Sequence, residues 1–207
     1  MRRERRAAIA VLLALSAALP GGISSSEART QSPATVKPAT VKPATVKPVH
    51  GLCSGASLQP TPANLARVAT ATLCLIQRER QADHLGLLRA NSSLQRIAAS
   101  QAQDMVVGDY FGDNTPAGGT PWQRITASAY AAGAHSLAAA QNIGWGTEQM
   151  ATPEGMVAIW MLSPPHREIM LTSGYRDIGV GVAPAAPSSL TEGLPGATYT
   201  VEFATRR

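Results

Sequence analysis

The sequence predicts an α+β fold, in which helices cover both faces of a small antiparallel sheet. Three short stretches have the pattern of strands, namely residues 141–146, 178–182 and 199–203. In the last two stretches, side chains of different size or polarity alternate, as expected for a strand that is buried mainly on one face. Helical patterns lie before and between the stretches. This order does not suit a doubly wound parallel sheet, and it favours helical layers on either side of an antiparallel one.

The two long helices are predicted from apolar residues that recur on one helical face. The first runs from about residue 64 to 83, and its residues 77–80 are expected on a charged surface. The second takes Asn91 or Ser92 as its N-cap and ends at Gly108. A shorter helix is expected from Pro121 to about Tyr130.

A further pair of helices is predicted around a rigid turn. Thr152-Pro153-Glu154 supplies an N-cap, a proline at the first helical position and an acid in the first turn. Pro164-Pro165 cannot extend that helix, so the chain turns there and starts a new one. His166 is therefore fixed at a helix start, where it is either a site residue or a structural hydrogen-bonding residue.

The N-terminal segment, residues 1–28, has the order of a secretory signal peptide. Four arginines precede an apolar run at residues 7–19, and Ser26-Glu27-Ala28 offers small residues for cleavage. The apolar run would rise about 20 Å as a helix, short of the roughly 30 Å hydrocarbon core. We therefore expect a cleaved signal, a mature form without a transmembrane anchor, and a location outside the cell or in the cell envelope.

Residues 29–51 contain the unit Pro-Ala-Thr-Val-Lys three times in succession. Proline at every fifth position blocks helix formation, and Ala, Thr and Lys supply no core, so we predict a disordered linker. Its lysines either contact an anionic envelope polymer or simply keep a spacer in solution, and the second interpretation is favoured.

The net charge of +5 does not describe the predicted domain at residues 52–207. Eight of the eighteen basic residues and two of the thirteen acidic residues precede residue 51, which leaves ten bases and eleven acids. The domain therefore has a net charge of −1, and a nucleic-acid partner is not expected. The domain is long enough to bury a core, and we expect it to be a monomer.

The two cysteines, Cys53 and Cys74, predict one disulfide bond. In a secreted chain, an even number of cysteines is typical of a disulfide framework. Two free buried thiols are the alternative. A metal site would need more soft ligands than these two.

Six motifs in order give the domain a family resemblance. They lie at residues 75–80, 88–94, 104–111, 141–143, 160–167 and 175–181, and include Gln141-Asn142-Ile143 and Ser163-Pro164-Pro165-His166-Arg167. Over about residues 64–203 the chain resembles the CAP superfamily, which comprises cysteine-rich secretory, antigen five and pathogenesis-related proteins, in its bacterial SCP-like extracellular branch. The resemblance implies an α-β-α sandwich with a solvent-facing cavity in which two histidines and acidic side chains converge.

The cavity positions depart from the family pattern. Phe111-Gly112-Asp113 stands where the family usually has Phe-Ser-His, and Gln141 stands where it has the glutamate of Glu-Asn-Ile. His166 keeps the histidine of the Pro-Gly-His-Arg turn, and a second glutamate of larger relatives would fall near Ser163. The candidate cavity residues are thus Asp113, Gln141, His166 and Ser163.

These departures weaken the family chemistry. Two imidazoles and a carboxylate would suit zinc, but Gln141 offers only a neutral amide oxygen and cannot titrate. Asp113 and His166 alone could form a weak divalent-metal site, or an ion pair with no other charged group beside it. In that pair the pKa of His166 would be raised. We expect no cofactor.

Two functional hypotheses follow. The first is a non-catalytic extracellular binding module for a lipid, a cell-wall component or a protein. The second is a metal-dependent hydrolase or peptidase that uses Asp113, Gln141 and His166. The missing histidine and carboxylate favour the first hypothesis.

Overall fold

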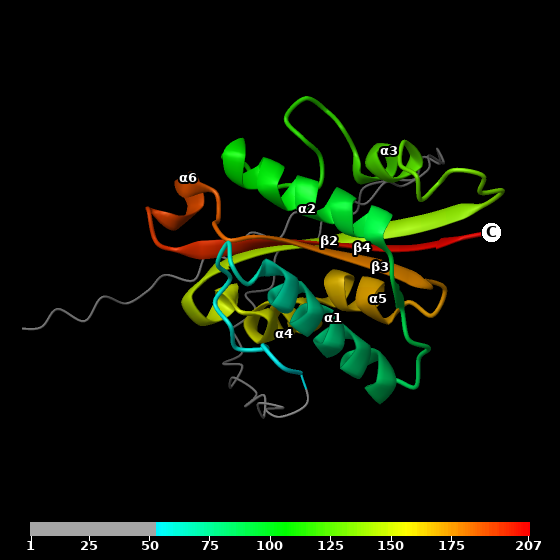
Figure 1. Ribbon diagram of the computed structural model, residues 1–207, viewed down its shortest axis with the longest axis horizontal. Helices are drawn as coiled ribbons and strands as arrows, with labels where there is room; N and C mark the ends of the chain where they lie inside the picture. Colours follow the sequence, from blue (N-terminus) through cyan, green and yellow to red (C-terminus); the bar gives the residue numbers. More distant parts are fainter. Residues whose placement is uncertain (1–52) are drawn as a thin grey trace, which may run out of the picture. The chain divides into compact units, whose positions relative to one another are not determined.

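A four-stranded sheet separates two helical layers in the computed structural model, which describes residues 53–207 (Figure 1). The strand order is β1-β3-β4-β2, with β1 at Arg89–Ala90, β3 at Asp177–Ala183, β4 at Gly196–Arg206 and β2 at Leu137–Thr147. β4 pairs antiparallel with β3 and with β2, whereas the short β1 pairs parallel with β3. The predicted α+β class is confirmed. The predicted signal peptide and linker lie outside the described residues.

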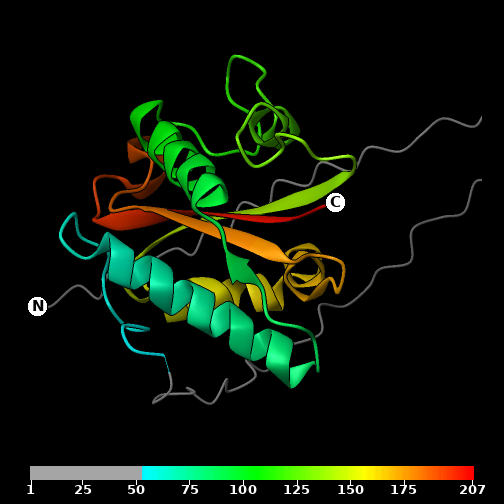
Figure 2. The same cartoon turned by 45° about the vertical axis from the view of Figure 1, so that its right-hand side comes forward.

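The helices lie on both sides of this sheet (Figure 2). One layer contains α1 (Leu65–Ala82), α4 (Pro153–Leu162) and α5 (Pro164–Leu171), and the other contains α2 (Ser92–Val107) and α3 (Pro121–Thr126). Two single-turn helices, η1 (Glu148–Ala151) and α6 (Ser188–Thr191), lie in connections. Among the described residues, no helix combines the length and the apolar character that crossing a membrane requires.

The two faces of the sheet differ in composition because side chains alternate along each strand. The face toward α1, α4 and α5 is called the apolar face, and its residues are Ile178, Val180, Val182, Tyr199, Val201 and Phe203. The face toward α2 and α3 is called the polar face, and it carries Asp177, Gly179, Gly181, Thr198, Thr200, Glu202, Ala204 and, from β2, Gln141.

α2 lies directly on two glycines of the polar face. A Cβ atom at Gly179 would come within 2.1 Å of the backbone of Leu94, and one at Gly181 within 2.1 Å of the backbone of Ala98. The helix begins where Asn91 caps it, since the Asn91 side chain accepts hydrogen bonds from two backbone N–H groups of the first turn. The close approach buries the apolar stripe of α2 without large side chains from β3.

The apolar face carries the main core, and the polar atoms of its two largest aromatic side chains are paired. The indole Nε1 of Trp160 donates to the carbonyl of Ile143 at 2.9 Å, and the hydroxyl of Tyr199 donates to the carbonyl of Ala151 at 2.8 Å. The two rings meet edge to face with centroids 6.3 Å apart. This side of the molecule therefore combines apolar burial with satisfied polar atoms.

The predicted disulfide is confirmed in the structure. Cys53 and Cys74 are joined with an S–S distance of 2.04 Å and a Cα–Cα distance of 5.7 Å. The bond holds the segment that precedes α1 against that helix.

Several local predictions were wrong. β2 begins at Leu137 rather than at Gln141, and α3 ends at Thr126 rather than near Tyr130. The end of α1 is not simply a charged surface, because Arg80 is fully buried. Its guanidinium donates to carbonyls of Gly86, Met170 and Thr172, so it joins the end of α1 to the end of α5.

Candidate functional site

Asp113 and Gln141 contact each other at the β2 edge of the sheet, as the sequence suggested. Gln141 Nε2 donates to Asp113 Oδ1 at 3.0 Å. The other side of the same amide is also used, since Gln141 Oε1 accepts from Arg124 Nη2 at 3.0 Å. That nitrogen also lies 2.8 Å from the backbone carbonyl of Asp113. The expectation that no further charged group stands beside these residues is therefore wrong.

Arg124 is held in this position by a well-capped short helix. Thr120 and Gln123 form a capping box at the start of α3, and Arg124 Nη1 donates to the carbonyl of Gly119 at 3.3 Å. Burial lowers the pKa of Arg124, and the nearby carboxyl of Glu202 opposes that shift. A guanidinium keeps its proton under such conditions, so a fixed positive charge lies inside the candidate site.

Glu202 is the second charged residue that the sequence analysis missed. It is the cross-strand partner of Gln141 on the polar face, and it has no exposed surface. Neither of its carboxyl oxygens has a hydrogen-bond partner among the described residues. Burial raises the pKa of Glu202 to about 8, even though the charge of Arg124 acts in the opposite direction. The carboxyl is therefore mostly protonated at neutral pH.

His166 lies in the first turn of α5, on the other side of the β2 edge. Its Nδ1 and the hydroxyl oxygen of Ser163 form a hydrogen bond of 2.7 Å. Its backbone carbonyl accepts from Asn142 Nδ2 at 3.0 Å. Successive residues of β2 thus contact opposite sides of the sheet edge. Gln141 contacts Asp113 on one side, and Asn142 contacts α5 on the other.

Asp113 and His166 do not form the expected ion pair. No salt bridge joins them among residues 53–207. Burial lowers the pKa of His166, and the charge of Asp113 only opposes this shift, so the prediction of a raised pKa was wrong. The half-buried imidazole is neutral at neutral pH, and its hydrogen-bond partner is the hydroxyl of Ser163 rather than a carboxylate.

Comparison with known proteins assigns this architecture. The model of the CAP, or cysteine-rich secretory protein, family matches residues 73–201. The chain belongs to the CAP family. It is 30% identical over 120 residues to the uncharacterized protein YkwD of Bacillus subtilis (strain 168). The aligned region covers 58% of this chain and 44% of YkwD. The chain therefore spans less than half of that relative's length.

Comparison with solved structures supports the fold. An outer surface protein of Borrelia burgdorferi has a TM-score of 0.52 at 20% identity, over 65% of this chain and 90% of that one. This likeness shows a shared fold. An extracellular SCP-domain protein of Bacillus anthracis is also similar, with a TM-score of 0.48 at 23% identity, over 71% of this chain and 44% of that one.

The residues present do not fit the zinc chemistry that the CAP resemblance implied. Gln141 already uses both ends of its amide within the protein, and a permanent cation contacts it. Within the described part of the chain, no group of three or more His, Cys, Asp or Glu side chains is placed to hold a metal ion. Asp113 and His166 come from opposite sides of the β2 edge, and Glu202 is protonated and fully buried.

Ser163 also lacks the surroundings of a nucleophile, despite its contact with His166. It is buried with 7% of its surface exposed. Serine hydrolases of the elbow type stabilise the oxyanion with the N–H of the residue after the nucleophile, and here that residue is Pro164, which has none. Ser163 instead occupies the N-cap position of α5, where its hydroxyl orients His166.

Proposed function

We propose that this CAP protein is a non-catalytic binding module of the cell exterior, with a cavity that recognises its ligand through hydrogen bonds and without a metal ion. The observation that carries the proposal is the position of Arg124, 3.0 Å from the Gln141 amide oxygen and 2.8 Å from the Asp113 carbonyl. The guanidinium occupies the Gln141 amide oxygen, which a metal ion would need as a ligand. The disulfide supports an oxidising, extracellular location for the domain.

Electrostatics supports a metal-free site. Two like unit charges 4 Å apart repel by about 4 kcal/mol at an effective dielectric constant of 20. A divalent ion that used Asp113 and Gln141 would carry twice that charge beside a guanidinium that cannot lose its proton. Arg124 therefore opposes metal binding in addition to replacing its electrostatic role.

The available polar groups favour a hydroxyl-rich or amide-rich ligand over a lipid tail. Asp113 presents a carboxylate acceptor, and the neutral ring of His166 can act as donor or acceptor through its second nitrogen. Arg124 orients this set, because its terminal nitrogens donate to Gly119, Asp113 and Gln141. Such mixed donors and acceptors suit the sugar hydroxyls and peptide amides of a cell-wall component. A lipid or a protein ligand is the outcome to be distinguished by experiment.

The ligand is tested by co-sedimentation with purified peptidoglycan, with neutral lipid vesicles as the comparison. We expect binding to peptidoglycan that is lost in Asp113→Asn and Arg124→Gln, because each substitution removes part of the hydrogen-bonded set. Arg96→Gln is the matched control, since Arg96 lies on the exposed side of α2 and its guanidinium donates to the hydroxyl of Ser93 in the same helix. Equal binding by all variants would disprove recognition through the cavity.

Metal dependence is tested by thermal unfolding with and without micromolar zinc. We expect no shift for the natural sequence. We also expect none for the double variant Asp113→His with Gln141→Glu, because the new carboxylate would pair with Arg124. Adding Arg124→Gln to that variant should free the carboxylate and produce zinc-dependent stabilisation. Tight zinc binding by the natural sequence, abolished by His166→Ala, would instead support a metal-dependent hydrolase.

A further inference from the structure

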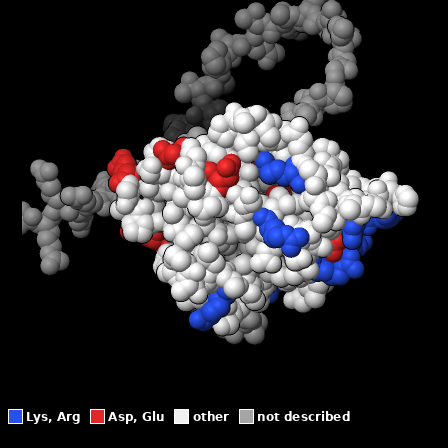
Figure 3. Space-filling model, turned by 45° about the horizontal axis from the view of Figure 1, so that its top comes forward, with Lys and Arg blue, Asp and Glu red and all other residues white. Residues whose placement is uncertain are grey.

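Basic residues gather at one end of the sheet, away from the candidate cavity. Figure 3 shows Lys and Arg side chains at the right-hand end and the centre of the molecule, with one group at the lower left, whereas most of the acidic side chains in this view lie toward the left. The C-terminus of β4 marks the same end in Figure 1. Four of the ten arginines in residues 53–207 belong to this end, and they are Arg89, Arg176, Arg206 and Arg207.

The strand register places these residues at the same end of the sheet, and they are called the arginine row. Arg89 begins β1, and Arg176 immediately precedes β3, which starts at the partner of Arg89. Arg206 ends β4, opposite the first residue of β2, and the backbone of Arg207 pairs with that of Ser136 just before β2. The four residues belong to three of the strands, since Arg206 and Arg207 both lie at the end of β4. Side chains alternate along a strand, so Arg206 projects on the polar face and Arg176 on the opposite one.

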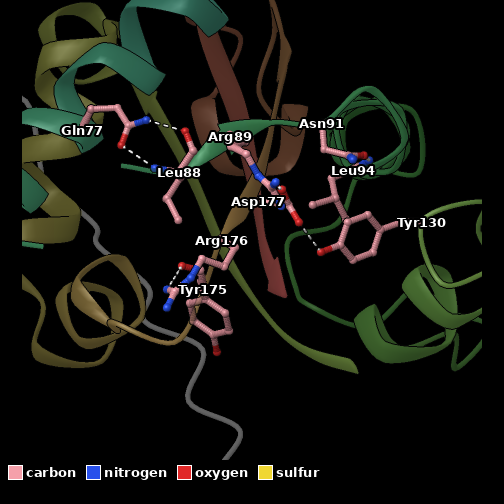
Figure 4. Close-up of polar contacts among 9 residues, drawn as sticks. All are labelled: Gln77, Leu88, Arg89, Asn91, Leu94, Tyr130, Tyr175, Arg176 and Asp177. Atoms are coloured by element: carbon pink, nitrogen blue, oxygen red, sulfur yellow. Dashed lines mark hydrogen bonds and ion pairs between the residues drawn. The ribbon is translucent and has the colours of Figure 1, made fainter. Parts of the chain in front are cut away.

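Two of the guanidinium groups are fixed by backbone carbonyls rather than neutralised by carboxylates. Arg176 Nη1 donates to the carbonyls of Ser173 and Tyr175, and Figure 4 shows this side chain folded back onto Tyr175. Arg206 Nη1 donates to the carbonyls of Tyr130 and Ala132. Each of these arginines keeps its charge, and its other terminal nitrogen can bind an outside partner. Because the side chain is already ordered, binding costs less conformational entropy.

The row contains little compensating negative charge. Asp177 is the one acidic side chain bonded to any of the four arginines among the described residues, and it is itself buried. Its two oxygens are shared between Arg89 Nε at 3.1 Å and the hydroxyl of Tyr130 at 2.8 Å (Figure 4). The Arg89 side chain is nevertheless 77% exposed, so its outer nitrogens remain accessible.

Arg80, another positive charge, adds to the excess of positive charge at this end of the sheet. Arg80 lies behind the row, and the charge of Arg176 lowers the pKa of Arg80 in addition to the larger effect of its burial. The fold therefore tolerates repulsion at this end although the domain as a whole carries more acids than bases. Such an uncompensated cluster is a signature of an anion-binding surface.

We propose that this row, Arg89, Arg176, Arg206 and Arg207, is a docking surface for a linear phosphate-bearing polymer outside the cell. Arginine binds phosphate in a bidentate manner, and a flexible polymer can contact guanidinium groups that project on both faces at this end of the sheet. A membrane surface is a poorer match, because Leu87 is the one large exposed apolar side chain next to the row among residues 53–207. The surface is separate from the cavity, so this proposal does not depend on the cavity ligand.

The test measures binding of the full domain to long-chain inorganic polyphosphate as a function of salt. We expect the affinity to fall steeply as salt rises. The variant Arg176→Gln with Arg207→Gln should bind at least about tenfold more weakly at low salt, and its salt slope should fall by about 2, because two phosphate contacts are lost. Arg207→Gln alone should lower the slope by about 1, and it removes no side-chain hydrogen bond that holds the fold.

The matched control is Arg67→Gln with Arg96→Gln, which removes the same charge from other exposed surfaces. We expect this control to bind polyphosphate as the natural sequence does. An equal loss in both double variants would mean that net charge alone governs binding, and it would overturn the proposal. Binding to phosphatidylglycerol vesicles without affinity for soluble polyphosphate would also overturn it. Cavity variants such as Asp113→Asn should leave polyphosphate binding unchanged, which separates this test from that of the cavity.

Discussion

The two faces of the sheet differ in the side chains that they bury and in how well the buried polar atoms are paired. The apolar face packs aromatic and β-branched side chains against α1, α4 and α5, and the buried polar atoms of Trp160 and Tyr199 are hydrogen-bonded. The polar face carries glycines, threonines and a carboxyl group under α2 and α3. Buried polar atoms of Thr200 and Glu202 have no partner among the described residues there. Stability is concentrated on the first face, and the candidate site lies beside the second.

This difference shows how a stable fold can carry unpaired buried polar atoms beside the candidate site. An unpaired buried hydroxyl or carboxyl costs about 1–3 kcal/mol, so Thr200 and Glu202 each lower the stability of the folded state. The apolar face supplies the compensation, because each fully buried large apolar side chain contributes about 1.5–3 kcal/mol. Changes near the cavity can therefore accumulate without unfolding the domain.

The largest expected effect comes from the close contact between α2 and the polar face. Gly181→Ala should lower the free energy of unfolding by about 4 kcal/mol, since its Cβ would lie 2.1 Å from backbone atoms of Ala98 and Ala99. Gly86→Ala is the control, because a Cβ there meets nothing within 4 Å. Urea unfolding of both variants measures the difference. A loss below about 1 kcal/mol for Gly181→Ala would show that α2 can move away from the sheet.

The next effect is a pH dependence that originates on the polar face. The pKa of Glu202 is raised, chiefly by burial, from its ordinary value of 4.5 to about 8. Below pH 4.5 the folded and unfolded states both hold the proton. Between these two values only the folded state holds it, so the free energy of unfolding should fall by at most about 1.4 kcal/mol per pH unit as pH rises, and above pH 8 the full penalty remains.

Glu202→Gln removes the titrating group while it keeps the shape of the side chain. We expect this variant to lose the decline between pH 4.5 and 8 and to be more stable than the natural sequence at alkaline pH. Chemical unfolding at several pH values provides the measurement. An unchanged pH profile would mean that Glu202 is ionised in the folded protein and is paired with Arg124 after all.

A slightly smaller effect is expected from the disulfide, which supports the apolar side. The bond between Cys53 and Cys74 closes a loop across 21 positions and holds down a segment whose Leu58 packs against the apolar core. Chain-entropy arguments give such a bond about 3 kcal/mol. Intact-mass analysis of the exported protein should detect the bond, and unfolding with reductant should show the loss. Thiols that alkylate without reduction in the folded protein would contradict both expectations.

The smallest effect compares one threonine from each side of the sheet. Thr200→Val removes a hydroxyl without a partner on the polar face, so stability should rise by less than about 1 kcal/mol. Thr72→Val removes a hydroxyl on α1 that donates to the carbonyl of Val68 at 2.9 Å, and stability should fall by a similar amount. Thermal unfolding of the pair would reveal opposite signs. If both variants are destabilised, the hydroxyl of Thr200 is satisfied by internal water.

The sequence predicts the fold well where periodicity is strong. The stripes of α1 and α2, and the alternation in residues 178–182 and 199–203, identify elements whose faces are buried as expected. The first part of β2 was missed because residues 138–140 are three alanines, which show no alternation. The connection between β3 and β4 contains a turn of helix, α6, whose Thr191 is buried, and no periodic pattern in the sequence marks it.

The candidate site was harder to predict because its charged residues are distant in the sequence. Arg124 lies on a short helix where arginine normally indicates a solvated surface, and nothing local points it toward Gln141. Glu202 did leave a signal, since residues 199, 201 and 203 form the apolar side of β4 and a carboxyl among their neighbours must face the other layer. Its pairing with Gln141 depends on strand register, which a single sequence does not specify.

The position of β4 in the sheet also constrains when the domain can fold. β4 is the last strand along the chain, yet it is the one that pairs with both β2 and β3. A growing chain that has not yet supplied residues 196–206 has no strand to place between β2 and β3. The sheet therefore closes from the inside, with the strand made after its neighbours inserting between them.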